Sequence, residues 1–79
     1  MTNNEKYVEA FKQALQLDDS VNIEALNYRD SGWDSVAHMV IMATLEDSFD
    51  IMMDTDDVID FSSFKKGKEI LGKYDVEFN

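Results

Sequence analysis

The sequence predicts an all-α protein: a four-helix bundle with one short third helix and a long loop between the first and second helices. Three observations predict this fold. Apolar residues recur at the three- and four-residue spacing that is typical of amphipathic helices. Serine, threonine and aspartate stand where those helices would begin, and helix caps require such side chains. Clear alternation of polar and apolar residues, which would predict strands, is confined to the brief segment 50–53.

Length and composition narrow the classes of protein. Seventy-nine residues allow one small core, so we expect a single domain over residues 1–79. The chain has no cysteine, so disulfides and thiolate metal sites are excluded, and any thiol chemistry must come from an added group. The sequence shows no apolar signal segment and no stretch of transmembrane length, which predicts a cytoplasmic protein without membrane insertion.

The charge is distributed very unevenly. The net charge is −10, and residues 30–60 hold nine acids and no Lys or Arg. Nucleic acid and anionic membranes would repel such a segment, whereas basic protein surfaces would attract it. We therefore expect protein partners and no binding of nucleic acid.

The first helix begins with a capping box, in which Thr2 is the N-cap and Glu5 stands three residues on. The helix should end near Leu17. Its apolar positions recur at helical spacing: Tyr7, Val8, Phe11, Ala14 and Leu15. Residues 17–34 then form a long connection, which we expect to be an ordered crossover with a turn of helix at Ile23–Leu26.

The second helix should be capped by Asp34 or Ser35 and run to about Phe49. Only Thr44 is polar in residues 39–45, so this helix is expected to be central and apolar most of the way round. Leu45 and Phe49 lie one turn apart and should both be buried.

Two further helices complete the predicted bundle. Thr55 can cap a short helix through residues 56–59, and Ser62 or Ser63 can cap the last helix. The inward side of the last helix is expected to hold Phe64, Gly67, Ile70, Leu71 and Tyr74.

Ser35 is the first candidate for a functional residue. A hydroxyl where a loop becomes a helix is exposed and lies beside the positive end of the helix dipole, which favours an attached anion such as a phosphodiester. The segment that contains Ser35 and three later segments form a motif pattern along the chain: Gly32-Trp33-Asp34-Ser35-Val36, residues 45–51 (LEDSFDI), Phe61-Ser62-Ser63-Phe64 and Ile70-Leu71.

Together these segments resemble an acyl carrier protein, and the resemblance covers about residues 4–74. In that family the serine carries a 4′-phosphopantetheine arm whose thiol holds an acyl group, which implies the same covalent cofactor on Ser35. The aspartate before it, here Asp34, belongs to the surface that a phosphopantetheinyl transferase recognises. Ser31 and Val36 stand where the family usually has leucine, and Trp33 fills the variable position, where we expect it to pack over the loop.

The resemblance implies a carrier and not an enzyme. It would deliver acyl intermediates, as thioesters, to biosynthetic enzymes of fatty acid, polyketide or related pathways. The expected partners are the transferase and the acyl-loading, condensing or transferase enzymes that have basic docking surfaces, and a monomer is expected. An aminoacyl or peptidyl carrier is one alternative; an unmodified acidic interaction or weak calcium-binding module is another.

Partner contacts are expected from two kinds of side chain. Val36 and Met39 would supply apolar contacts, although methionines 39, 42, 52 and 53 also suit a core. Six acids would present negative charge to basic enzymes: Glu46, Asp47, Asp50, Asp56, Asp57 and Asp60.

Two other features give weaker predictions. His38 lies one turn after Ser35 and is interpreted as a solvated histidine, or else as a group that approaches the phosphate; its acidic neighbourhood favours the charged ring. Zinc is excluded because a second histidine and any cysteine are missing. Asp54 and Asp56 suit a calcium loop, but Val58 and Ile59 fall where ligands belong, so no metal site is predicted.

Overall fold

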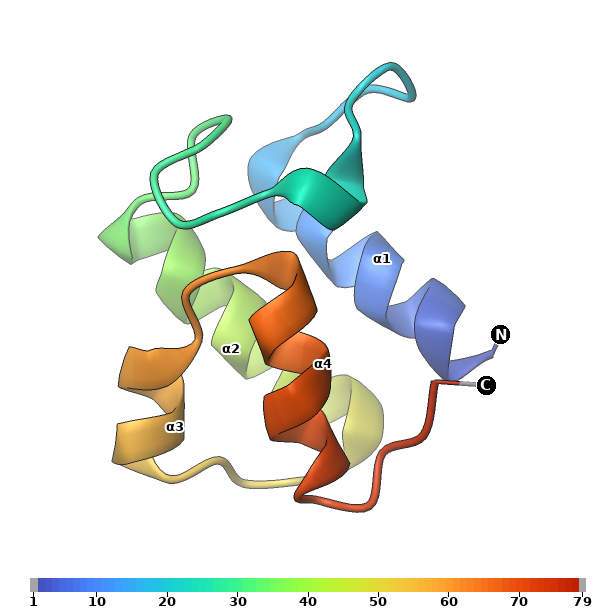
Figure 1. Cartoon of the computed structure of the whole chain (residues 1–79), viewed down its shortest axis with the longest axis vertical. Coiled ribbons are helices and arrows are strands. Elements are labelled where there is room, and N and C mark those ends of the chain that lie inside the picture. The colour runs from blue at the N-terminus through green and yellow to red at the C-terminus, as the bar shows by residue number, and fades with distance from the viewer. Residues whose placement is uncertain (1, 79) are drawn as a thin grey trace.

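A computed structural model describes residues 2–78, and this part of the chain is all-α, as predicted. Its helices pack into a small bundle (Figure 1). Within residues 2–78 the only β-type pairing is an isolated bridge between Asn27 and Ser63. The elements in chain order are α1 (Asn3–Leu15), a 3-10 turn (Ile23–Ala25), α2 (Ser35–Phe49), α3 (Thr55–Asp60) and α4 (Phe64–Gly72).

The capping box at the start of α1 is confirmed. The Glu5 amide donates to Thr2 Oγ1 at 3.1 Å, and the Thr2 amide donates to Glu5 Oε1 at 2.9 Å. The helix ends at Leu15, two residues before the predicted end, because Gln16 adopts a left-handed conformation with φ of 52°. Tyr7, Ala10 and Phe11 form its buried face.

Helix α2 ends at Phe49 as predicted, but only one of its sides faces the core. Ile41, Met42 and Leu45 are buried, whereas the opposite side of the helix stays exposed. Phe49 is only half-buried, so the prediction of full burial is wrong for this residue. It lies in the last turn of the helix, where its ring contacts Phe78 edge-on at 6.3 Å.

The caps of the last two helices differ in kind. Asp54 precedes α3 and makes no side-chain cap bond, so the prediction that Thr55 is the cap is wrong: Thr55 is the first helical residue. Ser63 caps α4, because its Oγ accepts the amide hydrogen of Lys66 at 2.9 Å. The predicted inward positions of α4 are buried, apart from Tyr74, which lies beyond the helix and is half-buried.

An aromatic cluster forms the centre of the core. Trp33 is fully buried and its ring meets that of Phe11 edge-on at 5.1 Å, which confirms that Trp33 packs inward. Tyr7 donates its hydroxyl hydrogen to the carbonyl of Phe64 at 2.6 Å, which joins α1 to α4. Burial raises the pKa of Tyr7 well above its usual range, so this donor keeps its proton.

The connection between α1 and α2 is tied to the start of α4. The Tyr28 amide donates to the carbonyl of Ser62 at 2.8 Å, and the Phe64 amide donates to the carbonyl of Leu26 at 3.0 Å. These bonds place Tyr28 and Trp33 next to the first turns of α2.

Candidate functional site

Ser35 lies at the exposed start of α2. Asp34 is the cap of this helix, since its carboxylate accepts the amide hydrogen of Ala37 at 2.9 Å. Ser35 is therefore the first helical residue, and within residues 2–78 its hydroxyl forms no hydrogen bond with the protein. The arrangement leaves the oxygen free for chemistry while Asp34 holds the helix start in place.

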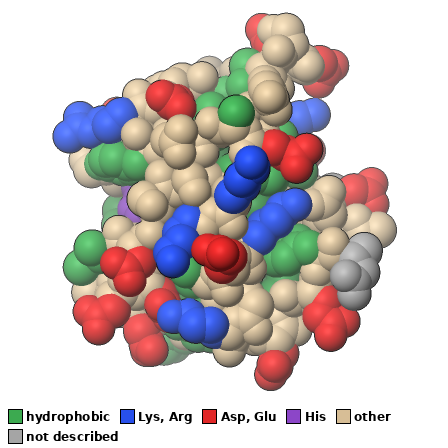
Figure 2. Space-filling view, in the orientation of Figure 1, with side chains coloured by type: hydrophobic (Ala, Val, Ile, Leu, Met, Phe, Trp, Pro, Cys, Tyr) green, Lys and Arg blue, Asp and Glu red, His purple; other side chains and the backbone are tan. Residues whose placement is uncertain are grey.

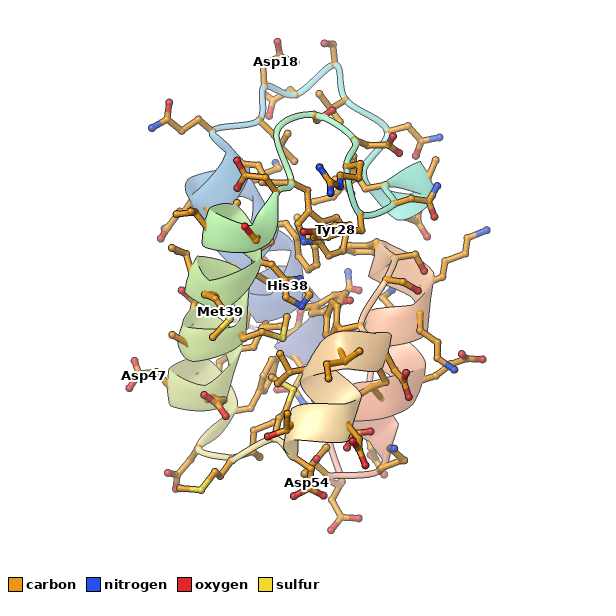
Figure 3. The ribbon with its side chains drawn as sticks, turned by 90° about the vertical axis from the view of Figure 1, so that its left-hand side faces the viewer. Asp18, Tyr28, His38, Met39, Asp47 and Asp54 are labelled. Atoms are coloured by element: carbon orange, nitrogen blue, oxygen red, sulfur yellow. The ribbon has the colours of Figure 1, made fainter. Side chains whose placement is uncertain are left out.

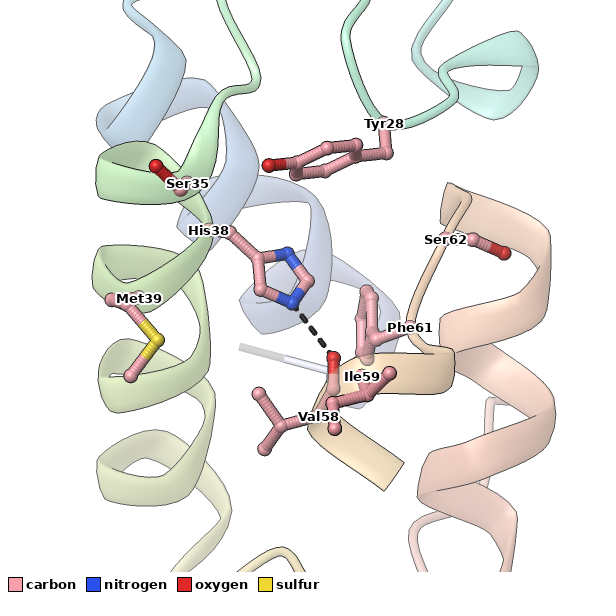
Figure 4. A pocket seen from close by; sticks show the side chains of 8 residues that line it. All are labelled: Tyr28, Ser35, His38, Met39, Val58, Ile59, Phe61 and Ser62. Carbon is pink, nitrogen blue, oxygen red and sulfur yellow. Dashed lines mark hydrogen bonds between the residues drawn. The ribbon is translucent and has the colours of Figure 1, made fainter. Parts of the chain in front are cut away.

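A pocket of about 380 Å³ opens beside Ser35, between α2 and α3 (Figure 4). Its surface is almost entirely apolar. The lining residues come from the loop before α2, from α2 itself and from α3 with the residues after it: Tyr28, Ser35, His38, Met39, Val58, Ile59, Phe61 and Ser62. The hydroxyl of Tyr28 points across the mouth of the pocket toward the start of α2.

Most of these lining residues were missed by the sequence interpretation. Val58 and Phe61 read simply as apolar residues of a short helix and its end, and Tyr28 as part of a loop. No short-range pattern marks them, because they reach the pocket only when α3 packs against α2.

His38 is a wall of this pocket and not the solvated surface residue that the sequence suggested. It points inward from α2, whereas Asp47 on the same helix points outward (Figure 3). The indole Nε1–H of the buried Trp33 donates to His38 Nδ1 at 3.0 Å, and His38 Nε2 lies 2.8 Å from the carbonyl oxygen of Val58. Since an indole nitrogen can only donate, Nδ1 must accept, so the ring is neutral and Nε2 carries the hydrogen.

Exposed apolar side chains lie on α2 and α3, and two of them, Met39 and Ile59, also line the pocket. Val36 is 72% exposed and Met39 is 60% exposed, so both side chains are accessible. Val40 on α2 and Ile59 on α3 are also exposed, and neither was predicted to be. Of the other methionines, Met42 and Met53 lie in the core and Met52 is exposed.

The predicted acidic residues fall into two groups. Asp47, Asp50, Asp56 and Asp60 are exposed, and acidic side chains gather at the lower left of Figure 2, where α3 lies. Glu46 is half-buried, because its Oε2 accepts the amide hydrogen of Met53 at 2.9 Å.

Asp57 requires a correction. We expected its carboxylate to face partners, but the side chain is only 10% exposed. It accepts hydrogen bonds from Lys73 Nζ and from the Tyr74 hydroxyl, each at 2.5 Å. These two donors hold the pKa of Asp57 below its usual range. Asp57 therefore links α3 to the end of α4 and is not part of a free acidic surface.

The described part of the chain contains neither a cluster of metal-binding side chains nor a helix that could span a membrane. Among residues 2–78, no three His, Cys, Asp or Glu side chains come together in a way that could hold a metal ion. None of the helices formed by these residues has the length and apolar character needed to cross a bilayer.

Comparisons with known proteins returned no match: the chain fits no protein-family model, and no curated protein or solved structure is significantly similar to it. The function must therefore be argued from the residues and geometry of this site.

Proposed function

We propose that this protein is a carrier of the acyl carrier type, in which Ser35 holds a 4′-phosphopantetheine arm. The arm would carry acyl intermediates as thioesters to biosynthetic enzymes, and the protein itself would catalyse no reaction. One observation carries the proposal: the unbonded hydroxyl of Ser35 stands at the first position of α2, on the rim of an apolar pocket. The helix order, with a short α3 before α4, supports the four-helix bundle expected of such a carrier.

The residues around Ser35 suit a phosphodiester. The first amide groups of α2 point toward the helix start, where the helix dipole favours negative charge. Asp34 satisfies the Ala37 amide, which leaves other amides of the first turn available to phosphate oxygens. When bound, the arm would supply the thiol that a chain without cysteine lacks.

The surroundings of Ser35 also suit cargo and partners. An apolar group tethered at the rim can lie in the adjoining pocket, which removes it from water. Val36 and Met39 offer apolar contacts next to the attachment point, and Asp47 and Asp60 add negative charge. Contacts of this kind with basic enzyme surfaces would form quickly and be short-lived. A cytoplasmic location and a monomeric state stay predictions of the sequence.

Attachment is tested by incubating the protein with coenzyme A, magnesium and a broad-specificity phosphopantetheinyl transferase, then measuring intact mass. The wild type should gain one arm and Ser35→Ala none. Ser62→Ala is the matched control, because Ser62 is an exposed hydroxyl of the same pocket and its removal should leave loading unchanged. An arm on Ser35→Ala would contradict the assignment.

The docking surface is tested by reversing charge at exposed acids. Asp47→Lys with Asp60→Lys should slow loading and weaken its dependence on salt. Glu9→Lys with Glu24→Lys makes the same change in net charge on α1 and the 3-10 turn, and should have little effect. Equal slowing by both pairs would mean that only net charge matters.

The rival functions differ in what is attached. Intact mass of the protein from its native cells would show an acyl, aminoacyl or peptidyl group on the arm, and so identify the cargo. A chain that never carries an arm would instead favour an acidic interaction module.

A further inference from the structure

The imidazole of His38 separates the pocket from the aromatic core. It lines the pocket on one side, and on the other its Nδ1 edge meets the N–H edge of the Trp33 indole, with ring centroids 6.0 Å apart and planes 20° from parallel. Tyr28 and Phe61 meet the imidazole edge-on at 5.6 and 6.0 Å. Trp33 itself is fully buried and does not line the pocket.

The hydrogen bonds of this ring require its neutral form. Trp33 donates to Nδ1 at 3.0 Å, and Nε2 donates to the Val58 carbonyl at 2.8 Å. A second proton would have to sit on Nδ1, where it would face the indole N–H. The buried indole would then lose its acceptor, which is costly for a polar group away from water.

The charged groups near His38 lie at the edge of the site. In the loop before α2, the Tyr28 phenol is in edge contact and the Arg29 guanidinium lies over the Tyr28 ring, 5.3 Å from its centroid. On α2 the nearest acid along the chain is Asp34, which is exposed and caps the helix. On α3, Asp57 comes directly before Val58 and Asp60 comes two residues after it.

The two acids of α3 differ in availability. Asp57 is bonded to Lys73 and Tyr74, whereas Asp60 is exposed. A charged imidazole would gain contact with water by turning toward the pocket mouth. It would not gain this contact by staying against the indole.

From this geometry we propose that His38 is a pH-sensitive gate between the pocket and Trp33. Near neutral pH the ring is bonded to Trp33 and closes the inner wall. In mild acid the protonated ring releases the indole and turns toward solvent, and the pocket extends to the N–H edge of Trp33. Among side chains, histidine is the one that ordinarily changes its charge between about pH 5 and pH 8.

The gate belongs to the unmodified chain, so it does not depend on an arm at Ser35. If the gate fails, the proposed carrier function is untouched; if loading fails, the gate can still be tested. Where both hold, acid would change the size of the group that the pocket accepts beside Ser35.

Trp33 is the only tryptophan of the chain, so it reports on the gate without labelling. The first measurement is the indole Nε1–H cross-peak in a nitrogen–proton NMR spectrum, followed from about pH 7.5 to about pH 5.5. The second is quenching of Trp33 fluorescence by acrylamide, a small neutral molecule, over the same range. The cross-peak should move upfield as the bond to Nδ1 is lost, and the quenching constant should rise several-fold.

His38→Gln removes the titrating group while leaving a side-chain amide that can reach the Val58 carbonyl. In this variant both signals should be independent of pH over the range. His38→Asn, whose carbonyl can accept from the indole, serves the same purpose if the glutamine variant does not fold.

Three results would overturn the gate. Wild-type signals could stay constant over the pH range, which would mean that the ring does not release Trp33. The variants could show the wild-type change, which would assign it to carboxylates. Helicity, followed by far-UV circular dichroism, could fall together with the Trp33 signals, which would make the change global unfolding.

Discussion

At the start of α2, two neighbouring side chains have separate tasks. Asp34 accepts the Ala37 amide hydrogen and so caps the helix, whereas the Ser35 hydroxyl is exposed and forms no hydrogen bond within residues 2–78. From the sequence either residue could have been the cap. The separation matters because a hydroxyl that caps a helix could not be modified without disturbing the helix start.

Replacement of these two residues should therefore have different effects on stability. Asp34→Ala should lower the free energy of unfolding by ~1 kcal/mol, because the Ala37 amide loses its acceptor. Ser35→Ala should leave it almost unchanged. Urea denaturation of the two unmodified variants measures this, and an equal loss in both would show that Ser35 shares the cap.

The role of Asp57 depends on the two side chains that bond to it. Lys73 and Tyr74 donate hydrogen bonds to its carboxylate and lower its pKa. Asp57→Asn should lower the melting temperature at neutral pH, because a neutral amide loses the ion pair with Lys73. Asp56→Asn removes the charge of an exposed neighbour and should have a smaller effect.

The stability difference between wild type and Asp57→Asn should depend on pH, because folding lowers the pKa of Asp57. A carboxylate whose pKa is lowered by folding contributes stability above its unfolded pKa, about 4. That contribution is lost as the pH falls through the lower value of the folded state. The gap between wild type and Asp57→Asn in thermal melts should thus be full at pH 7 and shrink below about pH 4; a gap that widens in acid would contradict this role.

At the scale of elements, α4 shows how tightly the helices pack. Gly67 faces the hydroxyl of Tyr7 and the ring of Phe61, and a Cβ atom at this position would overlap both. Gly72, at the end of the same helix, faces open space. The glycine at position 67 is needed because Tyr7 of α1 and Phe61, the residue after α3, approach the helix backbone so closely.

Substitution of the two glycines by alanine gives a matched pair. Gly67→Ala should destabilise the protein by ~1–3 kcal/mol, because two buried aromatic side chains must move. Gly72→Ala should be neutral or stabilising by up to about 1 kcal/mol, since alanine is the better helix former. Urea unfolding compares them, and a stable Gly67→Ala variant would mean that α4 sits further from α1.

At the scale of the whole molecule, the charges are segregated. Residues 30–60 carry nine acids and no base, whereas four lysines lie in residues 65–73. Figure 2 shows basic side chains across the face of α4 and acidic side chains beside them over α3. Only part of this charge is paired, because Asp57 alone among the nine acids forms an ion pair in the described chain.

Unpaired acids should repel one another and weaken the fold. Added salt, or millimolar magnesium without a specific site, should therefore raise the melting temperature of the wild type. The variant Asp47→Asn with Asp60→Asn should gain less from the same salt. Circular dichroism melts at low and high ionic strength test this prediction. A melting temperature that does not change with salt in either protein would show that repulsion between the acids does not destabilise the fold.

Several features of this protein could be predicted from the sequence alone because they depend on neighbours within one or two helical turns. The capping box of Thr2 and Glu5, the cap at Ser63 and the end of α2 at Phe49 all involve bonds or spacings of this short range. The exposed serine at a loop–helix junction belongs to the same class of signal.

The tertiary structure decided what those local signals left open. Sequence spacing could not say that Asp57 would meet Lys73, sixteen residues away, or that one side of α2 would stay exposed. Nor could it place the neutral ring of His38 between Trp33 and the carbonyl of Val58. The physical reason is the same in each case: burial and hydrogen-bond partners are set by which helices pack together, and α3 brings its partners to α2 and α4 only in the folded chain.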